Sequence, residues 1–179
     1  MTEEKTLSSE LIYQGRAVRL RVDTVRVPTG RKAIREIVEH DDCVAIIALD
    51  ADDKVLLVRQ FRKPVEKELL EIPAGGIDGG ESPEDAVGRE MQEETGYFPR
   101  KIERLGGFYS APGYSSEYLY LYLATDLVPG QLFAEDTEGI TLMKVPLESI
   151  QVDKTSGSVH GLSASSRFTS ALASGNSSA

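Results

Sequence analysis

Two glutamates, Glu90 and Glu94, have the residue type and the spacing to do chemistry in this chain. On a helical wheel with about 100° per residue, both fall between the apolar residues Ala86, Val87 and Met91. A helix here would turn two carboxylates towards the body of the protein, where like charges repel each other and lose hydration unless something compensates them. A divalent cation is the obvious compensation.

Oxygen ligands one helical turn apart suit a hard ion such as Mg²⁺ or Mn²⁺, and the sequence shows no cluster of Cys or His for zinc. Magnesium keeps several waters and binds substrate phosphates, so such a site indicates diphosphate or phosphate-ester chemistry. Arg89 lies four residues before Glu93 and can hold its carboxylate in place. The alternative interpretation is an ordinary solvated acidic face with a surface ion pair.

The helix that must carry these glutamates has clear end signals. Ser82 is a good N-cap, Pro83 suits the first helical position, Asp85 is placed as a capping-box partner, and Gly96 ends the helix. A glycine-rich loop, 75–80, precedes it. We expect the polar side of the helix to hold Asp85, Gly88 and Gln92.

The remaining elements are mostly strands. Alternating apolar residues in 11–40, with a turn at 28–30, predict an antiparallel hairpin or meander. Further strands are expected at 43–49, 55–58, 69–72, 118–124 and 140–145, a short helix at 146–150 and a weak helix around 162–172. This mixture predicts an α/β or α+β domain and not a helical bundle.

Composition narrows the classes of function. The 179 residues carry a net charge of −9 and are 40% hydrophobic, which fits one domain and argues against binding a phosphate backbone. The single Cys43 and a polar, acidic amino terminus indicate a reducing cytoplasm. The longest apolar run, 43–49, is too short to span a membrane. We therefore expect no nucleic acid and no membrane as partners.

The glutamate helix and the glycine before it resemble the Nudix box at every fixed position. The matching residues are Gly75, Glu81, Arg89, Glu90, Met91, Gln92, Glu93, Glu94, Thr95, Gly96 and the aromatic Tyr97. Further segments, 35–40, 59–62, 71–75 and 111–117, resemble the ADP-ribose pyrophosphatase branch, in which a proline about sixteen residues past the box is usual. Pro112 stands at that place.

The resemblance covers roughly residues 12 to 150 and implies a fold and a metal site. The fold is an α/β/α sandwich with a mixed sheet and an amino-terminal antiparallel extension. Mg²⁺, or Mn²⁺ in its place, would be bound by the carbonyl of Ala74 and by Glu90 and Glu94, with Glu93 reaching a second ion. The residues with structural roles in the box are Gly75, Glu81, Arg89 and Gly96.

The resemblance also implies a substrate pocket and a base. The residues that match substrate-binding positions are Arg35, Glu36, Arg62, Gly76, Pro112, Gly113 and Glu117. Family members carry the base in an acidic loop before the last strand. Here Glu138 matches the last acid of that loop, with Asp136 and Glu135 as alternates.

The implied reaction is Mg²⁺-dependent hydrolysis of ADP-ribose to AMP and ribose 5-phosphate. We divide the chain into an extension, 1–40, for dimerisation and substrate; a catalytic core, 41–150; and a weakly structured segment, 151–179. A homodimer with exchanged amino-terminal strands is implied. Two alternatives remain open, a broader hydrolase of nucleotide sugars such as GDP-mannose and a Nudix ligand sensor without turnover.

Overall fold

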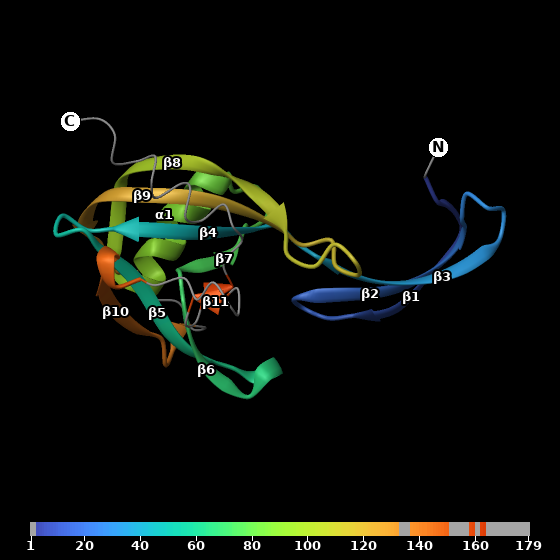
Figure 1. Cartoon of the computed structure of the whole chain (residues 1–179), viewed down its shortest axis with the longest axis horizontal. Coiled ribbons are helices and arrows are strands. Elements are labelled where there is room, and N and C mark those ends of the chain that lie inside the picture. Colours follow the sequence, from blue (N-terminus) through green and yellow to red (C-terminus); the bar gives the residue numbers. More distant parts are fainter. Residues whose placement is uncertain (1–2, 133–136, 151–157, 160–161, 164–179) are drawn as a thin grey trace. The chain divides into compact units, whose positions relative to one another are not determined.

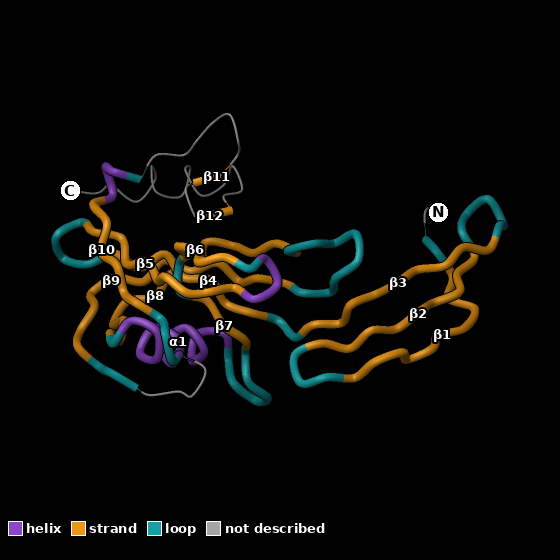
Figure 2. Tube along the Cα trace, turned by 90° about the horizontal axis from the view of Figure 1, so that it is seen from below, coloured by secondary structure: helices purple, strands orange, loops and turns teal. Residues whose placement is uncertain are grey.

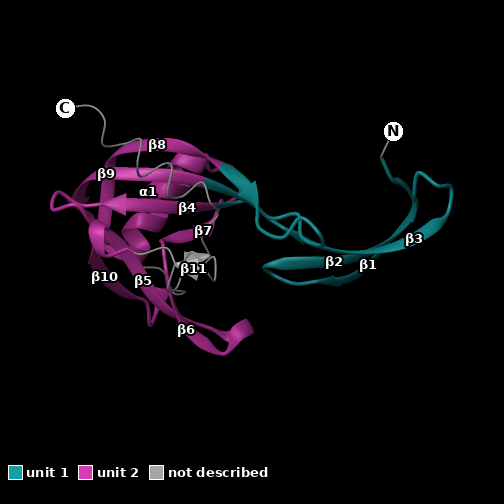
Figure 3. Cartoon of the chain, viewed as in Figure 1, with its two compact units in different colours: residues 1–43, 107–120 teal, residues 44–106, 121–179 magenta. Residues whose placement is uncertain are grey.

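The computed structural model describes residues 3–132, 137–150, 158–159 and 162–163. It divides into two compact units, coloured separately in Figure 3. We call residues 1–43 and 107–120 the N-terminal unit, and residues 44–106 and 121–179 the box unit.

The N-terminal unit is built on a three-stranded antiparallel sheet in the order β1–β2–β3 (Figure 1). The strands are β1 (Lys5–Gln14), β2 (Val18–Arg26) and β3 (Lys32–His40). Gly30, with a φ of 85°, makes the turn between β2 and β3 that the sequence predicts. The predicted meander is confirmed, although it begins at Lys5 and not at Leu11. Every residue of β1 is exposed.

The segment 111–117 of the same unit lies along β3. The amide of Val38 donates to the carbonyl of Tyr114 (2.8 Å), and the amide of Ser116 donates to the carbonyl of Val38 (3.0 Å). These two bonds flank a parallel bridge between Val38 and Ser115. The backbone therefore holds this segment against the end of β3.

The box unit contains most of a seven-stranded mixed sheet with the path β10–β5–β4–β9–β8, to which β6 adds beside β5 and β7 beside β4. Its elements are β4 (Cys43–Leu49), β5 (Lys54–Arg62), η1 (Lys63–Val65), β6 (Lys67–Glu71), β7 (Ala74–Gly76), α1 (Pro83–Thr95), β8 (Tyr97–Tyr109), β9 (Tyr118–Pro129), β10 (Thr141–Pro146) and η3 (Leu147–Ser149). The core is formed by the central strands, in which 44–48 and 55–58 are buried.

The helix α1 is the α-helix of the described residues and packs against the sheet, where it contacts β5, β7 and β10 (Figures 1 and 2). Ala86, Val87 and Met91 are completely buried, as the wheel predicts. The α/β fold with its amino-terminal antiparallel extension is confirmed.

Two local expectations need correction, and a third falls mostly outside the described residues. The 13-residue strand β8 was not expected, because Arg100, Lys101, Glu103 and Arg104 interrupt its apolar pattern. The predicted helix at 146–150 is a 3₁₀ turn, η3, whose first amide, that of Leu147, donates to the carbonyl of Asp53. The predicted helix at 162–172 lies outside the described residues, except that Leu162–Ser163 forms a short strand, β12, paired with β11 (Ser158–Val159).

No helix among the described residues is both long and apolar enough to cross a membrane.

Candidate active site

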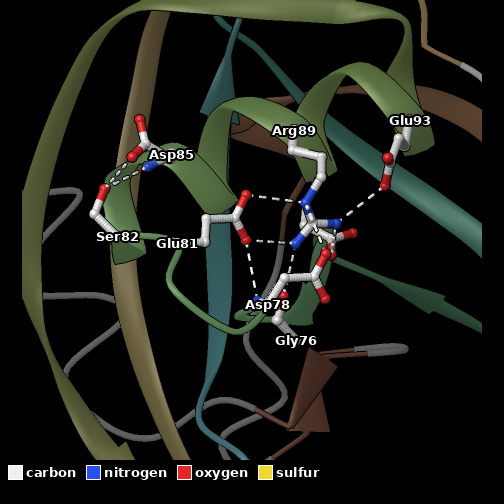
Figure 4. A network of polar contacts seen from close by, with 8 residues as sticks. Gly76, Asp78, Glu81, Ser82, Asp85, Arg89 and Glu93 are labelled. Carbon is white, nitrogen blue, oxygen red and sulfur yellow. Dashed lines mark hydrogen bonds and ion pairs between the residues drawn. The ribbon is translucent and has the colours of Figure 1, made fainter.

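The helix α1 begins and ends at the predicted residues. Figure 4 shows its start at Ser82. The hydroxyl of Ser82 accepts from the amide of Asp85 (3.1 Å) and donates to its carboxylate (2.6 Å). Gly96 closes the helix with a φ of 77°. The two caps fix the register of the helix, and with it the direction in which each glutamate points.

Arg89 is the centre of a network of polar contacts (Figure 4). Its guanidinium makes two hydrogen bonds to the Glu81 carboxylate (3.0 and 2.9 Å) and one to the carbonyl of Gly76 (2.8 Å). One nitrogen, Nη1, also donates to Glu90 (2.7 Å) and Glu93 (3.1 Å). The simple surface pair with Glu93 is thus only one of several contacts. Nε also lies 3.8 Å from the Asp78 carboxylate, so one cation is hydrogen-bonded to three carboxylates and ion-paired with a fourth.

Glu81 closes the glycine-rich loop as well as binding Arg89. Its carboxylate accepts from the amide of Asp78 (3.1 Å), and its own amide donates to the carbonyl of Asp78 (3.0 Å). The hydrogen bond from Arg89 holds the pKa of the Glu81 carboxyl below its usual value, although burial opposes this. Glu81 therefore acts as a charged brace between the loop and the helix.

The carboxylate of Glu90 is buried against β7, the short strand that begins the glycine loop. A Cβ atom built on Gly75 would lie 2.0 Å from Glu90 Oε1 and 2.4 Å from Oε2. Those distances are far inside van der Waals contact. A side chain at position 75 would therefore force the Glu90 carboxylate to move away from this place.

Glu94 lies one turn further along the same face. Its Oε2 accepts from the amide of Ala74 (3.0 Å). Burial, reinforced by the charges of Glu90 and Glu71, raises the pKa of Glu94 to about 8, against the opposing effects of the Ala74 amide and Arg62. Burial therefore disfavours the charged form of Glu94, and a cation bound at this carboxylate would favour that form again.

One wheel assignment was wrong. Gly88 is buried and does not lie on a polar face. The ring of Phe98 covers it, since a Cβ atom on Gly88 would meet the ring at 3.1 Å. Phe98 belongs to β8, the strand that the sequence did not indicate, so its packing on the helix was not expected either.

The other predicted residues of the box unit are placed as follows. Arg62 is bound to the Glu71 carboxylate through Nε (2.9 Å) and Nη2 (2.8 Å). Glu138 is exposed in the turn before β10. Asp136 and Glu135 lie outside the described residues.

The predicted substrate residues Arg35, Glu36, Pro112, Gly113 and Glu117 belong to the N-terminal unit. Arg35 donates to Glu4 through Nε (3.0 Å) and Nη2 (2.5 Å), so its ion pair is with Glu4 and not with the adjacent Glu36. Glu36 lines a mostly apolar pocket on the sheet. Pro112 and Gly113 lie in an exposed turn.

Sequence reasoning missed a second group of ligand-type side chains, in the N-terminal unit. His40, Cys43 and Glu117 each place one donor atom within 4.8 Å of the others. Cys43 is buried at the start of β4, but its neighbours are not those of an ordinary core cysteine. No local signal reveals the group, because Glu117 is 74 residues away from Cys43 in the chain.

The helix α1 packs on a mixed sheet, and Arg89 links three of its neighbouring carboxylates to the glycine loop. This is the architecture of a Nudix hydrolase. The chain belongs to this family, because the NUDIX domain model matches residues 39–160. A second model, the nucleoside diphosphate sugar hydrolase N-terminal domain, matches residues 4–38. The recognition of the box is thereby confirmed.

Relatives of known name are similar over most of the chain. An ADP-ribose pyrophosphatase of Bacillus subtilis is 39% identical over 148 residues, which is 82% of this chain and 80% of the relative. A methanol dehydrogenase activator of Bacillus methanolicus is 41% identical over the same shares. Among solved structures, an ADP compounds hydrolase is similar with a TM-score of 0.76 and 25% identity, covering 83% of this chain and 80% of that one.

Proposed function

We propose that this Nudix hydrolase cleaves the diphosphate of ADP-ribose, giving AMP and ribose 5-phosphate in a magnesium-dependent reaction. One observation carries the proposal: the arginine-anchored carboxylate cluster on α1 belongs to a chain 39% identical to an ADP-ribose pyrophosphatase over most of both lengths. A chain with only one cysteine is typical of proteins from a reducing compartment, which supports a cytoplasmic location.

The residues around α1 fit a hard divalent cation. The donors are oxygens only, Glu94 is buried with a raised pKa, and Gly75 leaves a cradle that the Glu90 carboxylate fills. We assign Glu90, Glu94 and the carbonyl of Ala74 as ligands, with Glu93 reaching a second ion. Mg²⁺, or Mn²⁺ in its place, supplies charge neutralisation for the diphosphate and a more acidic water.

The chain's own residues would bind the substrate and move a proton. Water attacks one phosphorus, the P–O bond of the anhydride breaks, and a carboxylate takes the proton of the water. We propose Glu138 as that base, because it is exposed in the turn before β10. Asp136 and Glu135 are alternates, and Glu93 is the remaining acid close to the proposed ligands.

Substrate contacts are proposed for seven residues. Arg62 would add a fixed positive charge for the phosphates, an interaction that strengthens where the transition state gains negative charge. The other proposed substrate-binding residues are Arg35, Glu36, Gly76, Pro112, Gly113 and Glu117.

The experiment that tests the function is a substrate panel. ADP-ribose, GDP-mannose and dinucleotides are incubated with the protein in Mg²⁺ and, separately, in EDTA, and alkaline phosphatase then releases phosphate from the monoester products. We expect fast, EDTA-sensitive turnover selective for ADP-ribose. Turnover that EDTA leaves unchanged would contradict the proposed metal site.

A broader activity on nucleoside diphosphate sugars is the second candidate. The match of residues 4–38 to the N-terminal domain of nucleoside diphosphate sugar hydrolases favours it. Comparable rates on ADP-ribose and GDP-mannose would support this candidate. If no compound is turned over, the remaining hypothesis is a ligand sensor without turnover. The relative from Bacillus methanolicus is named as an activator, which offers a precedent for such a role.

We further propose a homodimer with exchanged amino-terminal strands. All of β1 is exposed, including the large apolar residues Leu11, Ile12 and Tyr13, and Ile12 lines an apolar pocket with Leu20 and Val22. An uncovered apolar sheet face of this kind is typical of an interface. Sedimentation analysis should give a dimer mass, with Ile12→Asp shifting the equilibrium towards the monomer; a monomeric wild type would contradict the proposal.

A further inference from the structure

We propose that His40, Cys43 and Glu117 form a second metal site, for a divalent ion of the zinc class, apart from the carboxylates of α1. All three residues belong to the N-terminal unit. The proposal goes beyond hydrolysis, because it concerns a different ion and a different set of donor atoms.

The three donor atoms are spaced as a tetrahedral ion requires. Cys43 Sγ lies 3.5 Å from Glu117 Oε1 and 3.9 Å from His40 Nδ1, and His40 Nδ1 lies 3.7 Å from Glu117 Oε1. Zinc bond lengths with tetrahedral angles place such donors about 3.3–3.6 Å apart. Movements of a few tenths of an ångström would therefore complete the site.

The donor types select the ion. Thiolate sulfur and imidazole nitrogen favour zinc and its neighbours over Mg²⁺. A thiolate and a carboxylate together carry two negative charges, which match one divalent cation. The carbonyl of Asp41 lies 2.7 Å from His40 Nδ1, which is hydrogen-bond distance, so Nδ1–H donates to this carbonyl while no ion is bound. Binding of an ion would replace that proton on Nδ1, and a water would be the fourth ligand.

The backbone positions these residues before any ion binds. His40 ends β3 and Cys43 begins β4. Ser116, the neighbour of Glu117, binds His40 through its hydroxyl, which accepts from the His40 amide (3.0 Å) and donates to the His40 carbonyl (3.2 Å). The short segment before β9 is thus attached to the end of β3, and a preformed site requires little rearrangement.

Glu117 is oriented by a neighbouring side chain. The hydroxyl of Ser110 donates to Glu117 Oε2, which leaves Oε1 directed at the sulfur and the imidazole. Partners of this kind fix a ligand's orientation in metal sites. The side chains of His40 and Glu117 are 29% and 26% exposed, so an ion has a path to the buried sulfur.

The test uses Co²⁺ as a spectroscopic probe with the full-length reduced protein. Cys43 is the only cysteine in the chain, so a thiolate-to-cobalt charge-transfer band in the near ultraviolet can come only from this residue. We expect this band together with visible bands of tetrahedral cobalt, saturating at one ion per chain and displaced by Zn²⁺.

Three variants make the test specific. Cys43→Ser should abolish the charge-transfer band. His40→Gln, which alters a partly exposed residue and keeps the thiol, should retain the fold and weaken Co²⁺ binding at least about 10-fold. Glu94→Gln should leave the band unchanged, since it alters only the proposed magnesium site.

Either of two results would overturn the proposal. One is the absence of a thiolate band at millimolar Co²⁺, which would show the three residues to be a hydrogen-bonded group only. The other is unchanged affinity in His40→Gln. Neither result depends on turnover, so failure of this proposal and failure of the proposed hydrolysis are distinguishable.

Discussion

The carboxylate cluster on α1 and the His40–Cys43–Glu117 cluster differ in what holds each together before an ion binds. In the first, the permanent cation of Arg89 links the carboxylates directly. In the second, neutral donors do so, because the thiol of Cys43 and the hydroxyl of Ser110 both donate to Glu117. The first cluster therefore depends on one charged residue, whereas the second depends on neutral side-chain donors.

The largest effect is expected at the proposed magnesium ligands. Glu94→Gln keeps the shape of the side chain but removes a charge, so turnover of ADP-ribose at saturating Mg²⁺ should fall by at least about 10²-fold. Glu84→Gln, near the exposed start of the same helix, is the matched control and should keep its activity, since a glutamine oxygen still accepts from Tyr122. Near wild-type turnover in Glu94→Gln would remove the proposed site.

The next largest effect is expected on the stability of the folded protein when the first cluster loses its cation. Arg89→Met leaves three carboxylates without their cation, so the free energy of unfolding in EDTA should fall by about 3 kcal/mol. Mg²⁺ should restore part of the loss, because an added cation replaces the missing charge. Denaturant titrations in EDTA and in Mg²⁺ measure both quantities. Arg100→Met, on an exposed residue of β8, is the control; an equal loss in both variants would contradict the role of Arg89.

Without a bound metal, removing one side chain of the second cluster should change the stability of the protein only slightly. Cys43→Ser keeps a small donor next to Glu117, and we expect its free energy of unfolding in EDTA to change by about 1 kcal/mol or less. The same denaturant titration measures this value. A decrease in the free energy of unfolding as large as that of Arg89→Met would contradict the proposed difference between the clusters.

The smallest expected effect is a pH dependence of the stability that Glu81 of the first cluster contributes. The Arg89 hydrogen bond lowers the pKa of Glu81 in the folded protein below its ordinary value of 4.5, so this carboxylate stabilises the fold above that pH. Its contribution is lost as pH falls through the folded pKa. The difference in unfolding free energy between wild type and Glu81→Gln should therefore narrow from pH 6 to pH 3.5. A constant difference would show that the charge of Glu81 does not matter.

The sequence predicted correctly those elements whose signals lie close together in the chain. The caps at Ser82 and Gly96 gave both ends of α1, and the wheel placed Glu90 on its buried face, because these signals lie within a few turns of one helix. The apolar run 43–49 predicted both ends of β4 correctly. The family resemblance supplied the rest of the box, including Gly75.

The parts that depend on distant residues were not predicted. The charged strand β8 is held by its neighbours in the sheet and not by its own pattern, and the position of Gly88 followed from Phe98 of that strand. The contact of Cys43 with Glu117 joins residues 74 apart, and the partner of Arg35 is Glu4, 31 residues away. No periodicity within one element records such contacts.

The packing of Gly75 against Glu90 also has a consequence for how this chain can evolve. Because a β-carbon at position 75 would occupy the place of the Glu90 carboxylate, the two positions are coupled through space. Gly75→Ala should be harmful in the wild type but nearly neutral for folding once Glu90 is shortened to Ala, which is positive epistasis between two neighbouring sites. A lineage that lost the glutamate would therefore lose the constraint on the glycine as well, and the first position of the box would begin to drift.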